Sequence, residues 1–162
     1  MNAESMTTEI PSLGAAKIPT PVQRRADGAG DTSFVSDDNR IIIEVNDRQI
    51  AELLKSGQRL PCFETAGPRR QIFFDPSKLK CALVSCGGLC PGLNDIIRSI
   101  VLELHYGYGV RNIFGIRYGL QGFIPRYGHE LIDLTPQSVV NIHDRGGTVL
   151  GSSTEIYVQD LP

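Results

Sequence analysis

The fold of this chain is decided by Cys81-Ala82-Leu83-Val84-Ser85-Cys86-Gly87-Gly88-Leu89-Cys90-Pro91-Gly92-Leu93-Asn94 and by residues 95–106 that follow it. The apolar run 82–84 is long enough for a buried strand and too short for a helix, and Gly87-Gly88 ends it. Asn94 or Asp95 could cap a helix. Beyond that cap, apolar side chains share one helical face: Ile96, Ile97, Ile100, Val101 and Leu104. The stretch predicts a strand, a glycine-rich loop and a helix.

A loop of this kind suits a phosphate group. Glycine has no Cβ, so the N–H groups of Gly87 and Gly88 can approach a ligand closely. The start of the following helix adds unpaired N–H groups and the positive end of the helix dipole. The alternative is a tight turn that binds nothing. The loop is neither Gly-x-x-x-x-Gly-Lys-Ser/Thr nor Gly-x-Gly-x-x-Gly, so neither nucleotide-binding pattern applies.

Composition limits the classes of protein that fit. The chain has 162 residues, of which 41% are hydrophobic and 21% charged, as in ordinary globular proteins. Its net charge of -2 gives no indication of nucleic-acid binding. No apolar run approaches the ~20 residues that a membrane span needs, so no membrane is expected as a partner. The N-terminus lacks a hydrophobic signal core and contains acidic residues, and we therefore expect a cytoplasmic protein.

The chain is expected to divide into an N-terminal arm and extension, residues 1–77, and an α/β domain, residues 78–162. Residues 1–39 are rich in small and polar residues, and we expect an arm that is disordered or laid across another surface. A short strand is predicted at 41–45, a helix at 47–56 ended by Gly57, and an edge strand at 71–74. Arg69 and Arg70 either hold a phosphate or form a solvated basic loop.

The second domain contains one predicted βαβ unit. Residues 111–116 supply its second strand, which should run parallel to the first. Ligands of such sheets lie beyond the carboxyl ends of the strands, so the loop 117–122 should lie beside Gly87-Gly88. A small strand is predicted at 131–134, a helix from Thr135 with Pro136 at its first position, and another strand at 148–150.

Four segments resemble the phosphofructokinase family, most closely the branch shared by plants and some bacteria. The first is Cys86-Gly87-Gly88-Leu89-Cys90-Pro91-Gly92-Leu93-Asn94. The second combines Ala66-Gly67-Pro68-Arg69 with Phe73-Phe74-Asp75-Pro76, and the third combines Gly115-Ile116-Arg117-Tyr118-Gly119 with Gly122-Phe123. The fourth combines Ile142-His143 with Arg145-Gly146-Gly147-Thr148-Val149-Leu150-Gly151-Ser152-Ser153. The resemblance is to the amino-terminal part of the family. It implies a partial doubly wound parallel sheet, the first half of a nucleotide-binding domain, behind an extended arm.

The resemblance also implies a function. The family transfers a phosphoryl group from ATP, with Mg²⁺, to the 1-hydroxyl of fructose 6-phosphate, an early step of glycolysis. Some members use pyrophosphate instead of ATP. By resemblance, the second glycine of the pair, Gly88, contacts the donor nucleotide, while Gly87 is assigned beside it from the loop chemistry, and the full-length family forms homo-oligomers. Two alternatives stay open: a pyrophosphate-dependent enzyme, and a non-catalytic partner of a full-length phosphofructokinase.

The sequence departs from the family pattern at several positions. Leu120 stands where bacterial members have an aromatic residue beside the adenine. Arg98 maps to an arginine that binds an effector phosphate in some members. Thr154 stands where the family has an arginine that contacts donor phosphates. The magnesium motif Gly-Gly-Asp and the base motif Thr-Ile-Asp-Asn-Asp do not occur, so no catalytic or metal-binding residue is assigned. We therefore expect this chain alone to lack phosphofructokinase activity.

Overall fold

The structure is a computed structural model that describes residues 13–22 and 34–153. The chain divides into two compact units. The first comprises Met1–Thr20 and Arg24–Phe73, and the second comprises Pro21–Gln23 and Phe74–Pro162. The predicted domain boundary at residue 77 stays a prediction. Much of the predicted arm, residues 1–12 and 23–33, lies outside the described residues.

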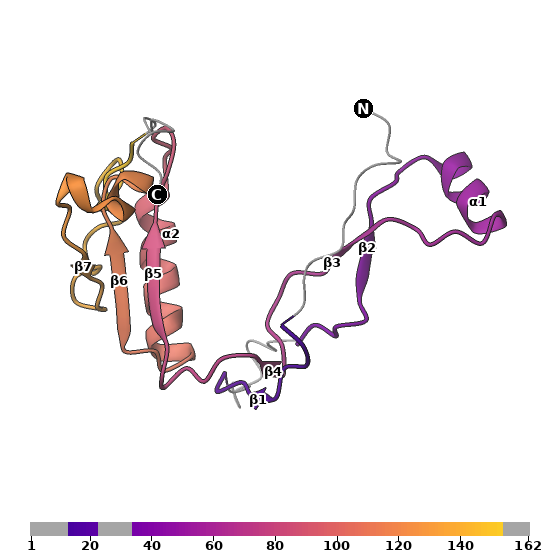
Figure 1. Cartoon of the computed structure of the whole chain (residues 1–162), viewed down its shortest axis with the longest axis horizontal. Coiled ribbons are helices and arrows are strands. Elements are labelled where there is room, and N and C mark those ends of the chain that lie inside the picture. The colour runs from indigo at the N-terminus through magenta and orange to yellow at the C-terminus, as the bar shows by residue number, and fades with distance from the viewer. Residues whose placement is uncertain (1–12, 23–33, 154–162) are drawn as a thin grey trace. The chain divides into compact units, whose positions relative to one another are not determined.

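The first unit is built from two antiparallel strand pairs (Figure 1). Strand β1 (Ile18–Pro19) pairs with β4 (Gln71–Ile72), so the described part of the arm lies against a later strand. Strand β2 (Arg40–Ile42) pairs with β3 (Cys62–Glu64), a strand that the sequence did not predict. None of the described residues of this unit is buried. Hydrogen bonds and ion pairs therefore carry more of its organisation than apolar packing does.

Helix α1 (Asp47–Lys55) forms where the sequence predicts it because both of its ends are capped. At the start, the Asn46 side chain accepts hydrogen bonds from the backbone N–H groups of Arg48 and Gln49. At the end, Gly57 has a φ of 70°, and the N–H of Gln58 donates to the carbonyl of Leu53 at 3.1 Å. This is the glycine-terminated hydrogen-bond pattern that commonly closes helices.

The second unit contains a three-stranded sheet in the order β5-β6-β7. Strand β5 (Lys80–Val84) and strand β6 (Asn112–Ile116) are parallel, with Val84 opposite Ile116, as the predicted βαβ unit requires. Strand β7 (Ile132–Asp133) is antiparallel to β6. The predicted α/β class is confirmed, and the sheet of the described residues is mixed rather than wholly parallel.

A hydrogen-bonded turn precedes the sheet. The Asp75 carboxylate accepts hydrogen bonds from the hydroxyl of Ser77 at 2.7 Å and from its backbone N–H at 3.0 Å. The bond from the Ser77 hydroxyl has the larger effect and the bond from its N–H the smaller. Both lower the pKa of Asp75 below its ordinary value, because they favour the charged carboxylate.

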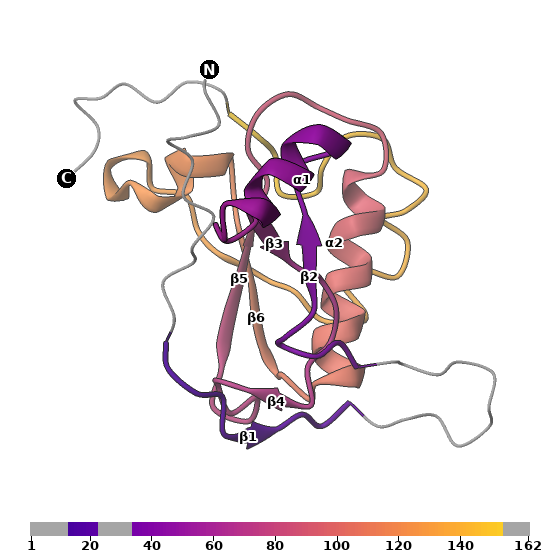
Figure 2. The same ribbon diagram turned by 90° about the vertical axis from the view of Figure 1, so that its right-hand side faces the viewer.

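Helix α2 (Leu93–Leu102) lies against β5 and β6 in both ribbon views (Figure 1, Figure 2). It continues into a π-helical turn, Glu103–Gly107, and Gly109 then reverses the chain with a φ of 74°. Of the predicted apolar face, Ile97 and Val101 are buried and Leu104 packs against the core. Ile96 is 57% exposed and Ile100 is also exposed, so the predicted apolar face is only partly covered in the described structure.

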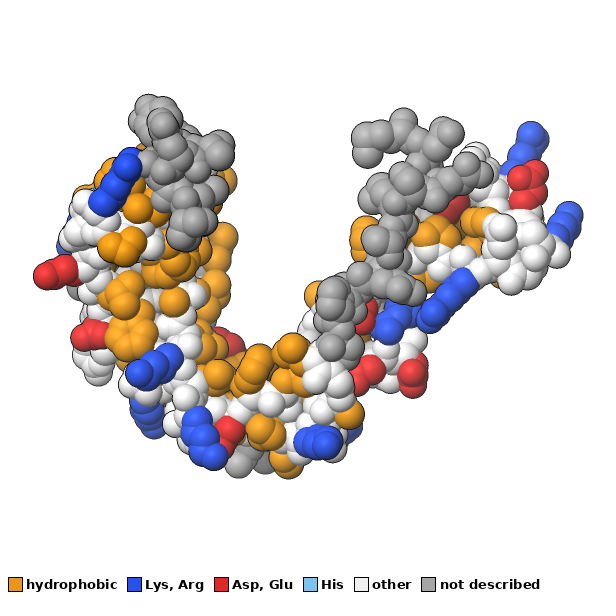
Figure 3. Space-filling model, in the orientation of Figure 1, with side chains coloured by type: hydrophobic (Ala, Val, Ile, Leu, Met, Phe, Trp, Pro, Cys, Tyr) orange, Lys and Arg blue, Asp and Glu red, His pale blue; other side chains and the backbone are white. Residues whose placement is uncertain are grey.

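The core of the second unit is one apolar cluster. Its buried members are Ile97, Val101, Val110, Ile113, Leu134, Val139, Ile142 and Leu150. Gly115, in β6, makes room for this cluster: a Cβ there would lie 2.4 Å from a methyl carbon of Leu150. Apolar side chains also remain at the surface of the unit, among them Val84 at 41% exposed (Figure 3).

Two predicted elements do not form. The helix predicted from Pro136 to an end at Gly146 does not form: residues 136–142 make successive turns, and the N–H of Val140 bonds the carbonyl of Gln137 three residues back. Three β-branched residues, Val139, Val140 and Ile142, lower helix propensity here. Residues 148–150, predicted as a strand, form a loop and turn: the N–H groups of Val149 and Leu150 bond the side chains of Asn94 and Thr148, and the carbonyl of Thr148 accepts from the N–H of Gly151. The part of the chain that the structure describes has no helix long and apolar enough to cross a membrane.

Candidate functional site

Three chain segments meet at the carboxyl ends of β5 and β6. Because Val84 is opposite Ile116, the chain leaves both strands at the same level, through Ser85 and Arg117. A Cβ added to Gly119 would lie 3.3 Å from the carbonyl oxygen of Ser85 and 3.3 Å from that of Ser153. The loop after β6 therefore contacts the start of the glycine loop, as predicted, and also contacts segment 151–153.

The glycine loop has an open backbone. Gly87 adopts a φ of 88°, in the region that favours glycine. Gly88 has no such φ, and a Cβ added there would meet no atom within 4 Å. The space around the Gly88 backbone is therefore accessible to a ligand. Cys86 and Cys90, in the same loop, are exposed free thiols.

Helix α2 begins directly after this loop without a side-chain cap. Its N-cap is Gly92, with a φ of 87°, and the described residues provide no side-chain cap hydrogen bond there. The prediction of Asn94 or Asp95 as the cap was wrong, because Asn94 is already inside the helix. The helix start combines uncapped N–H groups with the positive end of the dipole, a combination that favours an anion, while Asp95 in the first turn offsets part of this charge.

Asn94 instead joins the helix to segment 145–149. Its side-chain Nδ2 donates to the carbonyl of Arg145 at 2.9 Å, and its Oδ1 accepts from the N–H of Val149 at 2.8 Å. The residue is 4% exposed. A buried amide that uses both ends in this way fixes the distance between two segments.

Hydroxyl groups join the same segment to β5. The Ser85 hydroxyl lies 3.0 Å from the Thr148 hydroxyl and donates to the carbonyl of Gly151 at 3.0 Å. The N–H of Leu150 donates to the Thr148 hydroxyl at 3.2 Å. Segment 148–151 is thus held against the end of β5 although it has no helix or strand. Sequence reasoning missed Ser85, Asn94 and Thr148, since their partners are 51 to 66 residues away.

Tyr118, in the loop after β6, has a strained left-handed backbone conformation. Among the described non-glycine residues it is the one with a positive φ, at 56°. Its N–H donates to the carbonyl of Leu150 at 3.0 Å, and its ring fills the space beside Gly151. Arg117 and His129 pack on this ring, with the guanidinium carbon 5.0 Å and the imidazole centroid 4.6 Å from the ring centroid. Backbone strain of this kind concentrates at functional sites.

Two residues singled out by the resemblance lie at separate places on the second unit. Leu120 is exposed in the short 3₁₀ helix Gly119–Phe123, immediately after Tyr118. Arg98 lies within α2, and its Nε is buried without a hydrogen-bond partner among the described residues. No contact between Arg98 and the glycine loop is present among the described hydrogen bonds.

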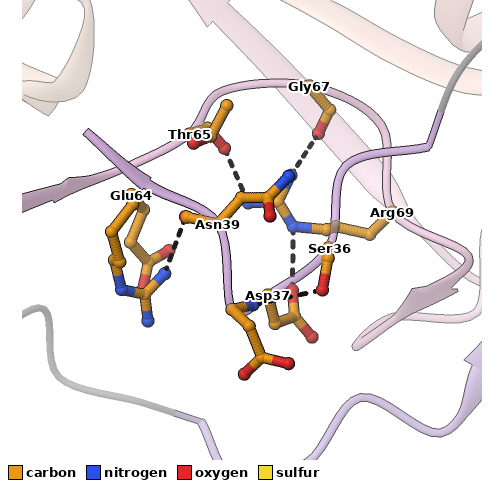
Figure 4. Close-up of polar contacts among 9 residues, drawn as sticks. Ser36, Asp37, Asn39, Glu64, Thr65, Gly67 and Arg69 are labelled. Carbon is orange, nitrogen blue, oxygen red and sulfur yellow. Dashed lines mark hydrogen bonds and ion pairs between the residues drawn. The ribbon is translucent and has the colours of Figure 1, made fainter.

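Arg69 has a structural role in the first unit (Figure 4). Its three guanidinium nitrogens donate to the carboxylate of Asp37 at 2.8 Å and to the carbonyls of Gly67 and Thr65 at 3.1 and 2.7 Å. Arg70 lies with its guanidinium carbon 5.0 Å from the ring centroid of Phe34. Of the two predicted alternatives, a phosphate site and a solvated loop, neither describes Arg69, whose donors are engaged within the chain.

The described residues contain no group of three or more His, Cys, Asp and Glu side chains that could hold a metal ion. The site offers backbone N–H groups, hydroxyls and a helix start, which suit an anionic ligand.

Comparison with known proteins identifies the family. The family model described as Phosphofructokinase matches residues 80–160, half of the chain. The chain belongs to the phosphofructokinase family. The match begins at β5 and includes the glycine loop, α2 and β6. The predicted membership is confirmed.

Individual phosphofructokinases match a larger part of the chain. An ATP-dependent 6-phosphofructokinase of Borreliella burgdorferi is 41% identical over 152 residues, which cover 93% of this chain and 33% of that protein. One of Amycolatopsis methanolica is 43% identical over 120 residues, 74% of this chain and 26% of that protein. ATP-dependent 6-phosphofructokinase 2 of Arabidopsis thaliana is 36% identical over 157 residues, 94% of this chain and 33% of that protein. The chain spans about a third, or less, of the length of these relatives.

Proposed function

We propose that this chain provides part of the donor-binding surface of an ATP-dependent 6-phosphofructokinase. The reaction is phosphoryl transfer from ATP to the 1-hydroxyl of fructose 6-phosphate, giving fructose 1,6-bisphosphate. The observation that carries the proposal is the meeting of Ser85, Gly119 and Ser153 beside the open glycine loop. The printed names of the relatives, ATP-dependent 6-phosphofructokinases, support the choice of reaction.

In this proposal the chain contributes positioning and electrostatic stabilisation. The N–H groups of Gly87 and Gly88 donate hydrogen bonds to phosphate oxygens, and the uncapped start of α2 adds its positive partial charge. Phosphoryl transfer depends mainly on contributions of this kind, because charge on the phosphate oxygens must be held in place during the reaction.

Magnesium enters the proposal with the nucleotide. Mg²⁺ bound at phosphoryl-transfer sites is commonly held by one or two carboxylates together with the phosphates of the substrate. The described residues do not offer a cluster that fits the ion by itself. We therefore assign no side chain of this chain to Mg²⁺ and derive no step through it.

The proposal distinguishes binding from turnover. The printed sequence contains neither Gly-Gly-Asp nor Thr-Ile-Asp-Asn-Asp, the motifs that the resemblance links to magnesium and to the base. We expect the chain alone to bind a donor without phosphorylating fructose 6-phosphate. A coupled assay that showed turnover by contaminant-free protein would contradict this expectation. A cytoplasmic location and a homo-oligomeric assembly stay predictions from the sequence and its resemblance.

The binding proposal is tested by titrating the full chain with Mg-ATP and, separately, with pyrophosphate, using calorimetry. The variant Gly88→Ala is the sharpest probe, because its methyl group meets no atom of the chain within 4 Å yet lies where a phosphate would approach. We expect at least tenfold weaker ATP binding at an unchanged melting temperature. Gly146→Ala, which is equally free of contacts, is the matched control and should bind as the unmodified chain does.

The titrations also distinguish the donors. Tighter binding of Mg-ATP than of pyrophosphate supports an ATP-dependent member, and the reverse order supports the pyrophosphate-dependent alternative. Equal ATP affinity of Gly88→Ala and the unmodified chain would remove Gly88 from the site.

A further inference from the structure

Segment 148–153 is held by a hydrogen bond within itself and by side-chain and backbone hydrogen bonds from other parts of the second unit. It contains no helix or strand among its described residues, so its backbone groups need other partners. Those partners include Ser85, at the end of β5, and Tyr118, at the end of β6. The position of segment 148–153 therefore depends on the two strands that carry the loops of the proposed site.

The hydrogen bonds at Ser85 run in one direction. A hydroxyl has one proton to donate. Ser85 donates its proton to the carbonyl of Gly151, so in the 3.0 Å contact between the two hydroxyls Thr148 is the donor and Ser85 the acceptor. Thr148 in turn accepts from the N–H of Leu150. The result is a hydrogen-bond chain from Leu150 through Thr148 and Ser85 to Gly151, which we call the hydroxyl relay.

The relay links the N–H of Leu150 and the carbonyl of Gly151 through Ser85, which directly follows β5 and precedes Thr148 and Gly151 by 63 and 66 residues. Both hydroxyls act as donor and acceptor, so each bond polarises the next, and these contacts are partly buried. A second contact holds the same turn from the other strand, since Tyr118 donates to the carbonyl of Leu150 at 3.0 Å. The backbone at 150–151 is thus fixed from both sides.

Ser85 connects this turn to the glycine loop with little intervening chain. Only Cys86 separates Ser85 from Gly87. At the other end of the relay, Gly151 is followed by Ser152 and Ser153, and the Ser153 carbonyl lies against Gly119. Any movement of Gly151 relative to Ser85 would change the spacing between the glycine loop and segment 151–153.

We propose that Ser85 and Thr148 are positioning residues for the phosphoryl donor. They set segment 151–153 at a fixed distance from Gly87 and Gly88, so that the two segments form one phosphate-binding surface. The inference rests on the proposed function and adds to it a role for two hydroxyls that do not themselves touch the donor. Small displacements of positioning groups weaken binding and catalysis strongly, which is why such a relay affects affinity.

The experiment compares three variants of the full chain with the unmodified protein. Ser85→Ala and Thr148→Val each break the relay with little change of volume, whereas Thr148→Ser keeps the hydroxyl. Thr135→Val is the control, since Thr135 also bonds a backbone N–H, that of Ser138, within an exposed turn. Mg-ATP affinity is measured by titration, and the amide exchange of residues 149–153 is measured by mass spectrometry.

We expect Ser85→Ala and Thr148→Val each to weaken Mg-ATP binding about tenfold and to speed exchange at 149–153, while Thr148→Ser and Thr135→Val stay within twofold. The double variant Ser85→Ala/Thr148→Val should bind about as weakly as either single variant, because both changes break one relay. Rescue by Thr148→Ser together with this non-additivity would not follow from a general loss of stability.

Three outcomes would overturn the inference. Unchanged ATP affinity in both relay variants would show that the relay does not position the donor site. An equal loss in Thr135→Val would show a general effect of removing a threonine hydroxyl. Failure of the unmodified chain to bind Mg-ATP, inorganic phosphate or pyrophosphate would refute the proposed function itself, and the inference with it. In the first two results the unmodified chain still binds Mg-ATP, so failure of this inference is distinguishable from failure of the proposed function.

Discussion

Replacing Asn94 tests how segment 145–149 is held against α2. In Asn94→Leu, the volume is nearly kept while both hydrogen bonds are lost, those to the carbonyl of Arg145 and from the N–H of Val149. Because Asn94 is 4% exposed, water cannot readily replace the lost partners. Two backbone groups lose their partner, the carbonyl of Arg145 and the N–H of Val149, at about 1–3 kcal/mol each and roughly 4 kcal/mol together, and the added apolar burial returns roughly 1 kcal/mol. We expect the free energy of unfolding to fall by about 3 kcal/mol.

A second variant, Asn94→Asp, separates the two bonds. The carboxylate still accepts from Val149, but an oxygen now faces the carbonyl oxygen of Arg145 at the 2.9 Å that the amide N–H used to bridge. Protonation of the new carboxyl restores a donor toward Arg145. Folding therefore favours the protonated form, and the stability deficit of Asn94→Asp should be largest near neutral pH and should shrink as the pH falls.

The assay is urea unfolding of the full chain, followed by far-UV circular dichroism at a series of pH values. Asn112→Asp is the matched control, since it makes the same change of charge at an exposed position in β6. The reasoning is refuted if Asn94→Leu unfolds within 0.5 kcal/mol of the unmodified chain, a margin on the order of ordinary surface effects. A deficit of Asn94→Asp that does not change with pH would refute the assignment of Nδ2 as the donor to Arg145.

Two further substitutions test other contacts. Arg69→Lys should destabilise the first unit by about 1–2 kcal/mol, because an ammonium cannot reach the three acceptors that the planar guanidinium bonds, and the loss should appear as faster amide exchange of the first unit. Its control, Arg70→Lys, should destabilise the first unit by less than about 1 kcal/mol, the size of an exposed cation–π contact. If the two variants destabilise the first unit equally, the hydrogen bonds of Arg69 do not have the structural role described above. Gly115→Ala should lower the free energy of unfolding by about 1–3 kcal/mol, since its Cβ would meet the buried Leu150 side chain at 2.4 Å. An equal free energy of unfolding for Gly115→Ala and Gly146→Ala would contradict this.

Sequence patterns predicted the elements whose signals are local. Helix α1 follows from apolar spacing and from the stop signal at Gly57, while its cap, Asn46, came only from the structure; β5, α2 and β6 follow from one βαβ pattern. The parallel direction of β5 and β6 was also predictable, because a helical crossover between neighbouring strands requires it. The family followed from motifs within the same segments.

The remaining features depend on contacts between distant segments. The turns at 136–142 have a capping signal at Thr135, yet β-branched residues and core packing of Val139 and Ile142 prevail over it. The antiparallel direction of β7 has no local signal. At the candidate site, glycine spacing pointed to Gly87 and Gly88, while the roles of Ser85 and Asn94 depend on partners more than 50 residues away.

The uncapped start of α2 has a practical consequence for measuring this protein. Because Gly92 supplies no side-chain acceptor, any anion that binds there completes the helix and stabilises the folded state by mass action. An anion at ten times its dissociation constant adds about 1.4 kcal/mol, as much as several of the substitutions above. Melting temperatures taken in phosphate or sulfate buffer should therefore exceed those taken in a chloride buffer of equal ionic strength. A change of buffer anion therefore changes how much ligand is bound at the helix start, and variants should be compared in the same buffer.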